Sequence, residues 1–161
     1  MACCWLAACK KKDENPKTPE PVSKSKYTYL TTDKWRVAEV YAVNNAPTRD
    51  IIINYYLDVM KECEKDNLIS FNTDGTITSD EGPLKCDTSI AQITTDGNWL
   101  VEKDTTQFTL KDSKAFPLKG NLSAKIEILD DNTFTISKDT TVNFGTMKIE
   151  GTIYASFKKI K

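Results

Sequence analysis

The last segment of the chain alternates strictly between apolar and polar residues, which is the side-chain period of a β-strand. One face would carry Met147, Ile149, Gly151, Ile153, Ala155 and Phe157, and the other Lys148, Glu150, Thr152, Tyr154, Ser156 and Lys158. The pattern predicts a strand with one buried face and one face in solvent. A register shift of one residue would reverse every assignment.

Shorter segments repeat this pattern along the chain. They cover residues 34–43, 68–72, 76–79, 98–103, 107–111, 125–129 and 133–137. Turn signals separate them, among them Thr73-Asp74-Gly75, where Gly75 can adopt a positive φ. Half-buried alternation favours antiparallel pairing. We therefore predict an all-β, mainly antiparallel fold, an up-and-down barrel of about eight strands.

One helix is expected in the N-terminal half, from Thr48, its capping residue, to about Lys65. A single helical stripe would carry its apolar residues, which are Ile52, Tyr56, Val59 and Cys63. The β-branched run at residues 51–53 works against this helix.

Composition limits the possible functions. The chain of 161 residues has the size of one domain and carries 22 basic against 23 acidic residues, so no nucleic-acid footprint is indicated. It contains no histidine. A zinc site is rejected on this ground, and Ser or Cys nucleophiles lack a histidine to activate them. Acid–base chemistry by a carboxylate pair stays possible, but no cofactor is expected and we predict a protein that is not an enzyme.

The N-terminus reads Leu6-Ala7-Ala8-Cys9 and resembles the lipobox of bacterial lipoproteins, in which the cysteine is acylated. The preceding apolar segment is short and lacks basic residues, so we interpret it as a truncated signal peptide. A cytosolic protein with an accidental match is the alternative. Acyl chains on Cys9 would anchor the protein stably in a membrane.

The domain organisation follows from this lipobox. We assign 1–8 to the signal remnant, 9–26 to the lipidated cysteine with a proline-rich linker, and 27–161 to the barrel. In the linker, Lys10-Lys11-Lys12 followed by Asp13-Glu14 is a solvated tether or resembles a surface-export signal of some Gram-negative lipoproteins.

With Cys3 and Cys4 removed and Cys9 acylated, Cys63 and Cys86 form an even pair, which an envelope compartment would oxidise. Two buried free thiols are the alternative.

The region from Cys63 to Trp99 resembles a family of lipocalin-like bacterial lipoproteins. The shared residues are Cys63, Asp66, Asn67, Phe71, Asp74-Gly75, Gly82, Cys86 and Gly97-Asn98-Trp99, after a strand bearing Trp35. The resemblance covers about residues 31–157. It implies an eight-stranded barrel with the helix stapled near one end by Cys63–Cys86. The Gly-x-Trp of lipocalins proper is absent from the first strand, where residues 32–35 read Thr-Asp-Lys-Trp. The likeness to ligand-carrying lipocalins is therefore a structural analogy, which does not by itself establish a function.

Calcium is a competing interpretation of the predicted hairpin. Positions one, three, five, six, seven and twelve of an EF-hand loop would be Ser70, Asn72, Asp74, Gly75, Thr76 and Glu81. Position one lacks a carboxylate and both flanks have the pattern of strands, so the hairpin is favoured.

Two functions remain. The barrel could carry a small apolar ligand, with candidate lining residues Trp35, Phe71, Trp99, Phe108, Ile126, Phe134 and Ile149. The same residues could simply form the core, which we favour. Alternatively, the domain displays a surface to an envelope protein or glycan. We expect a monomeric binding module on the outer membrane, periplasmic or surface-exposed, with a ligand that the sequence does not identify.

Overall fold

The computed structural model describes residues 24–102, 106–115, 117–144 and 147–161; the lipobox with Cys9 and the linker up to residue 23 lie outside them. The strands are β1 (Lys34–Asn44), β2 (Ile51–Asn54), β3 (Leu68–Phe71), β4 (Thr76–Asp80), β5 (Ile93–Val101), β6 (Gln107–Ser113), β7 (Gly120–Leu129), β8 (Thr133–Phe144) and β9 (Met147–Ile160). The helices are α1 (Lys26–Thr31), α2 (Tyr55–Asp58) and α3 (Glu62–Lys65).

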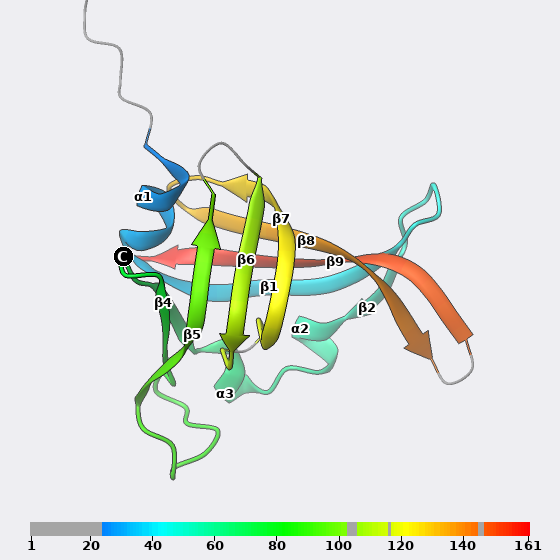
Figure 1. Cartoon of the computed structure of the whole chain (residues 1–161). Helices are drawn as coiled ribbons and strands as arrows, with labels where there is room; N and C mark the ends of the chain where they lie inside the picture. Colours follow the sequence, from blue (N-terminus) through cyan, green and yellow to red (C-terminus); the bar gives the residue numbers. More distant parts are fainter. Residues whose placement is uncertain (1–23, 103–105, 116, 145–146) are drawn as a thin grey trace, which may run out of the picture.

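The sheet closes into a barrel because β1 pairs with β9, the last strand of the order β2-β1-β3-β4-β5-β6-β7-β8-β9. All pairings are antiparallel, and the closing pair runs from Lys34 opposite Ile160 to Asn44 opposite Gly151. Eight strands form the closed barrel. The ninth strand, β2, is not part of the closed ring and pairs with residues 41–43 of β1. The predicted all-β, lipocalin-like up-and-down barrel is confirmed. Figure 1 shows the β8–β9 hairpin projecting beyond the barrel alongside β2.

The long helix predicted from Thr48 to Lys65 is wrong. Its first part forms β2, which pairs with β1, and only α2 and α3 are helical. The β-branched side chains of residues 51–53 suit a strand and are restricted in a helix. The apparent helical stripe therefore arose from a strand and two single turns.

Helix α1 covers one end of the barrel. It begins at Lys26 with Ser25 as its N-cap, so the folded domain starts slightly before the predicted end of the linker at residue 26. Its capping residue Ser25 accepts a hydrogen bond from the Thr28 N–H at 3.2 Å. The buried Leu30 accepts a hydrogen bond from Trp35 Nε1 at 3.0 Å. Tyr27 stacks on Trp99 with ring centroids 5.2 Å apart. These contacts close the barrel at this end.

The hairpin predicted at Asp74-Gly75 connects β3 to β4. Gly75 has φ +84°, and the Asn72 N–H donates to Thr76 O at 2.9 Å. Asp74 Oδ1 accepts hydrogen bonds from the Thr76 N–H and hydroxyl, which lower the pKa of this carboxyl. The turn itself thus uses the carboxylate that the calcium interpretation needed.

The face assignments of β9 are correct at Ala155 and Phe157, are met in part at Ile149 and Ile153, and are wrong at Thr152. Phe157 and Ala155 are buried, Ile153 and Ile149 are half-buried, and Lys148, Glu150 and Lys158 are exposed. Met147 is a residue whose side chain is not described. Thr152, expected in solvent, is only 8 % exposed. Its hydroxyl donates to Asp139 Oδ1 at 2.7 Å, and Asn45 Oδ1 lies 3.3 Å away, so polar partners bury it on the outer face.

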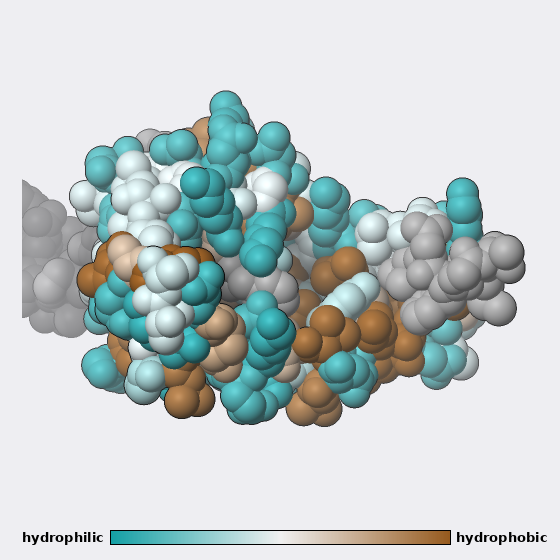
Figure 2. Space-filling view, turned by 90° about the horizontal axis from the view of Figure 1, so that it is seen from below, coloured by the Kyte–Doolittle hydropathy of each residue, from teal (hydrophilic) through white to brown (hydrophobic). Residues whose placement is uncertain are grey.

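Apolar side chains gather on one side of the surface, over α2 and β2 (Figure 2). Ile51, Leu57 and Val59 are each more than half exposed there. The barrel beside them is mainly hydrophilic in this view.

Candidate functional site

The aromatic residues proposed as ligand-lining all lie in the end of the barrel that α1 covers. Trp35, Phe71, Trp99, Phe108 and Phe134 come from five strands and are all buried. Phe134 lies at their centre, with centroid distances of 5.9 Å to Trp35, 5.8 Å to Phe71 and 5.1 Å to Phe108.

These rings fill the interior. Phe71 links the two tryptophan regions, because it contacts Trp99 edge-on at 5.5 Å as well as Phe134. The contacts are edge-to-face or stacked at the distances of close-packed aromatic pairs. Of the two aliphatic candidates, Ile126 is buried and Ile149 is half-buried. The favoured interpretation, in which these residues form the core, agrees with this packing.

Toward the opposite end the interior becomes polar on the side formed by β4, β5 and β6. Ser79 of β4, Asp96 of β5 and Ser113 of β6 are each at most 6 % exposed. Strand β4 shows the change within three residues, since Ile77 belongs to the apolar core and Ser79, the next buried residue, does not. An eight-stranded barrel is just wide enough to be filled by side chains or to hold one small ligand. Small polar side chains at this end leave the space that rings occupy at the other.

We call the resulting cavity the polar mouth. It has a volume of about 500 Å³. Its lining residues are Glu64, Asn67, Ser79, Glu81, Cys86, Ile90, Thr94, Thr95, Asp96, Lys114, Ala115 and Lys119. The volume lies within the ~300–1,000 Å³ that small-molecule sites occupy.

Asp96 is the most unusual residue of the polar mouth. Its backbone carbonyl accepts a hydrogen bond from the Lys114 N–H at 3.1 Å, next to the positive-φ residue Gly97. Within the described residues its carboxylate has no hydrogen bond or ion pair, although the residue as a whole is only 6 % exposed. The buried hydroxyl of Ser113 also lacks a partner. Buried polar groups without partners are rare in folded proteins and costly.

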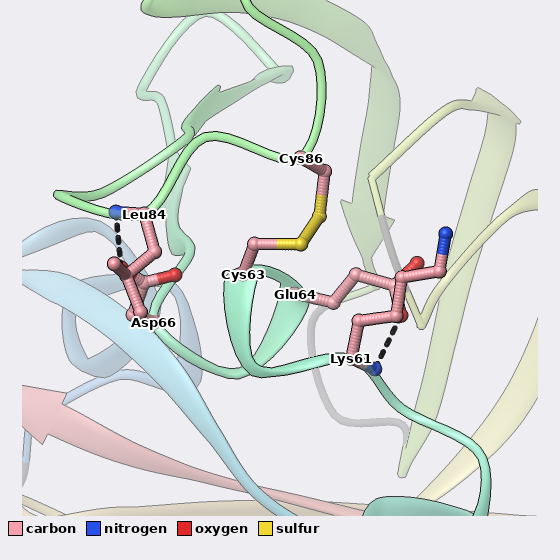
Figure 3. Close-up of a disulfide and its surroundings, with 6 residues drawn as sticks. All are labelled: Lys61, Cys63, Glu64, Asp66, Leu84 and Cys86. Atoms are coloured by element: carbon pink, nitrogen blue, oxygen red, sulfur yellow. Dashed lines mark hydrogen bonds between the residues drawn. A yellow bond between two sulfur atoms is a disulfide. The ribbon is translucent and has the colours of Figure 1, made fainter.

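The disulfide builds one wall of the polar mouth. Cys63 of α3 is bonded to Cys86, with their Cα atoms 5.2 Å apart, as the cysteine count predicted (Figure 3). The Glu64 carboxylate accepts a hydrogen bond from the Lys61 N–H at 2.9 Å and so caps α3. The bond ties α3 to the loop between β4 and β5, and Cys86 itself lines the cavity.

Other residues of the motif hold the same loop. Asp66 Oδ2 accepts a hydrogen bond from the Leu84 N–H at 2.8 Å (Figure 3). Gly82 has φ +68°, and a Cβ there would lie 2.7 Å from Asp66 O, so the loop passes too close for a side chain. With its amide nitrogen facing both carbonyls, Asn67 donates to Cys63 O at 2.9 Å and Glu81 O at 2.8 Å. The Cys-x-x-Asp-Asn motif therefore serves the wall of the cavity.

The far end of this loop is fixed by Gln92. Its amide donates to Asp80 Oδ1 at 2.8 Å and to Gly82 O at 2.9 Å. The first of these bonds is the main reason that the pKa of the Asp80 carboxyl is lowered, and Lys34 contributes as well. The loop is thus held at its start, at Cys86 and at its end.

A second recess of about 500 Å³ lies on the outer face of β7, β8 and β9. Its polar groups are bonded to one another: Ser137 donates to Glu127 at 2.6 Å, and Thr152 donates to Asp139. The hydrogen bond from Ser137 and the ammonium of Lys125 lower the pKa of Glu127. These polar side chains therefore have hydrogen-bond partners within the protein, unlike the carboxylate of Asp96 in the polar mouth.

Sequence reasoning missed the polar mouth. Asp96 and Gly97 precede the predicted strand 98–103, whereas β5 begins at Ile93 and continues through an irregularity in its pairing with β4. One signal was present, because Ser79 continues the inward phase of Ile77. A polar residue at a core position is the informative exception to alternation.

Neither a family model nor a curated protein matches this chain. Among the described residues, no helix has the length and apolar character needed to cross a bilayer.

Proposed function

We propose that the chain is a non-enzymatic cell-envelope lipoprotein of the lipocalin-like family, anchored to the outer membrane through Cys9. Its barrel acts as a binding module, and the polar mouth is the binding site. The anchoring is supported by the resemblance of residues 6–9 to a lipobox. The non-enzymatic role is supported by the absence of histidine from the chain, which removes the commonest general base.

One observation carries the binding role: the two ends of the barrel interior are built differently. Aromatic rings pack one end, while the other holds a 500 Å³ cavity lined by Asp96, a buried residue whose carboxylate has no partner among the described residues. A cavity with a few convergent polar groups is the usual form of a small-molecule site. The disulfide and Asp66 hold its wall in place before a ligand arrives.

Carriage of a hydrophobic molecule in the interior is the alternative, and the packing gives it less support. The mainly apolar recess, lined by Leu118, Leu122, Ile136 and Ile153 among others, has a volume of about 160 Å³. That is below the ~300 Å³ at which typical ligand pockets begin.

The binding role is tested by NMR titration of the full chain with small ammonium, carboxylate, polyol and apolar compounds. Binding should shift amide resonances of the polar mouth. Thr94→Trp, which fills the cavity, should abolish the shifts, whereas Leu100→Trp, at an exposed position of the same strand, should keep them. Shifts confined to Phe71 and Phe134 would favour the carrier, and no shifts with any compound class would contradict both.

The anchoring is tested by metabolic labelling with a fatty-acid analogue, with a complete signal peptide supplied. Cys9→Ser should lose the label and release the protein from the membrane fraction. Cys4→Ser is the matched control and should keep it. Equal labelling of both variants would contradict acylation at Cys9.

A further inference from the structure

The carboxylate of Asp96 determines what the polar mouth can bind. A carboxylate is an acceptor only, so its bonding needs are met by donors alone. Asp96 is 6 % exposed, lines the cavity and receives no donor from the described residues. A ligand that enters the cavity can supply the missing donor.

The charges around it favour a cation as that donor. Glu64 and Glu81 also line the cavity, which gives it three carboxylates against the two ammonium groups of Lys114 and Lys119. No ion pair joins Lys114 to Asp96 within the described parts of the chain. A charge-assisted hydrogen bond is about twice as strong as a neutral one. A hydroxyl that donates to the carboxylate also forms such a bond, but a protonated amine brings in addition a positive charge that compensates the negative charge of Asp96, so it gains more here than a hydroxyl.

Part of the remaining wall is apolar, while Asn67, Ser79, Thr94 and Thr95 contribute polar side chains. Ile90 and Ala115 line the cavity together with the disulfide sulfur of Cys86. The apolar groups among them can pack against a hydrocarbon body. The site thus combines one buried anionic acceptor with a partly apolar wall.

We propose that the polar mouth binds small organic ammonium ions, with the protonated amine donating to Asp96 and the apolar part against Ile90 and Ala115. This inference rests on the proposed function and names the ligand class of the same site. The buried carboxylate is then the specificity-determining group, and it meets its partner only in the complex.

The test compares benzylamine, which is protonated at pH 7, with benzyl alcohol, which has nearly the same shape without the charge. Amide resonances of residues 94–96 and 114–115 are followed in the full chain. Benzylamine should bind at least about tenfold more tightly than benzyl alcohol, a difference of about 1.4 kcal/mol.

Two variants localise the effect. Asp96→Asn keeps the shape and removes the charge, and should weaken benzylamine at least about tenfold while leaving benzyl alcohol unchanged. Glu150→Gln removes one charge at an exposed site on β9 and should bind both as wild type does. The dispersion of each variant's spectrum verifies that it is folded.

The outcomes separate the two proposals. If benzyl alcohol binds as tightly as benzylamine, or Asp96→Asn binds benzylamine like wild type, the ammonium preference is wrong and the binding site stands. If neither compound shifts the mouth, the ammonium inference is overturned. The wider titration with carboxylates, polyols and apolar compounds then decides whether the mouth binds anything.

Discussion

The two ends of this barrel share the strands β4, β5 and β6, but the interior along these strands is apolar at one end and polar at the other. At the end covered by α1, the barrel is filled by rings that contact one another, and Phe134 touches four of them. At the end with the polar mouth, Ser79, Asp96 and Ser113 occupy inward positions, and among the described residues the buried hydroxyl of Ser113 and the carboxylate of Asp96 have no hydrogen-bond partner. We infer that the packed rings supply more of the stability, so that the other end can keep groups that are costly to bury.

The largest effect should come from the aromatic end. Phe134→Ala removes a fully buried ring at the centre of the cluster and should lower the free energy of unfolding by about 3–5 kcal/mol. Urea denaturation measures the loss. Ile128→Ala, at an exposed position of β7, is the control and should change it by less than about 0.5 kcal/mol. A loss below about 1 kcal/mol for Phe134→Ala would mean that this end is not tightly packed.

Reduction of the disulfide should have the next largest effect on stability, and the local effect should be confined to the wall of the polar mouth. The bond closes a sequence separation of 23 residues, for which the chain-entropy model gives about 3 kcal/mol. Reduction should therefore lower the unfolding midpoint by several degrees. Hydrogen exchange should accelerate in residues 81–92 and stay unchanged around Phe134. Two free thiols in the native protein, counted by alkylation and mass spectrometry, would contradict the bond.

Two buried hydroxyls allow a comparison between a group with a hydrogen-bond partner and a group without one. Thr135 lies 3.0 Å from the Ser156 hydroxyl, so Thr135→Val should cost about 1 kcal/mol. Ser113 has no partner, so Ser113→Ala should be neutral or stabilising by up to about 1 kcal/mol. Urea midpoints of the two variants are compared. A destabilising Ser113→Ala would show that its hydroxyl is bonded in solution.

Lowering the pH should decrease the stability of the fold through one carboxyl near each end of the barrel, and each contribution should be smaller than the effects above. Hydrogen bonds from Thr76 lower the pKa of Asp74 at the closed end, and that from Gln92 lowers the pKa of Asp80 near the mouth. A carboxyl with a lowered folded pKa stabilises the fold above its unfolded pKa of about 4 and loses this contribution as the pH falls through the folded value. Thermal midpoints should therefore decrease below about pH 5. Asp80→Asn should reduce this decrease, and an acid response identical to wild type would contradict the role of Asp80.

Alternation was enough to predict the closed end of the fold. Trp35, Phe108 and Phe157 each lie in the inward phase of a predicted strand and are buried. Period 2 is a local property, so it can be read without knowing the partner strands. The same reasoning predicted the hairpin at Gly75 and the antiparallel barrel.

Prediction failed where the environment is set by distant residues. The run at 51–53 is a strand because it pairs with β1, and Thr152 is buried because Asp139 and Asn45 reach it across the outer face. Strand β5 extends five residues before the predicted start, through an irregular stretch that breaks the alternation. Asp96 lies in that stretch, so the residue on which the binding site depends was invisible to periodicity.

The central claim is that the polar mouth keeps a buried, unpaired carboxylate at the expense of stability, and Asp96→Asn tests it most directly. The free energy of unfolding of wild type and variant is measured by urea denaturation at pH 7 without ligand. We predict that Asp96→Asn is at least as stable as wild type, because the variant removes a negative charge from a buried residue that has no partner among the described residues. A variant that is less stable than wild type would contradict it, since the carboxylate would then be a bonded part of the fold.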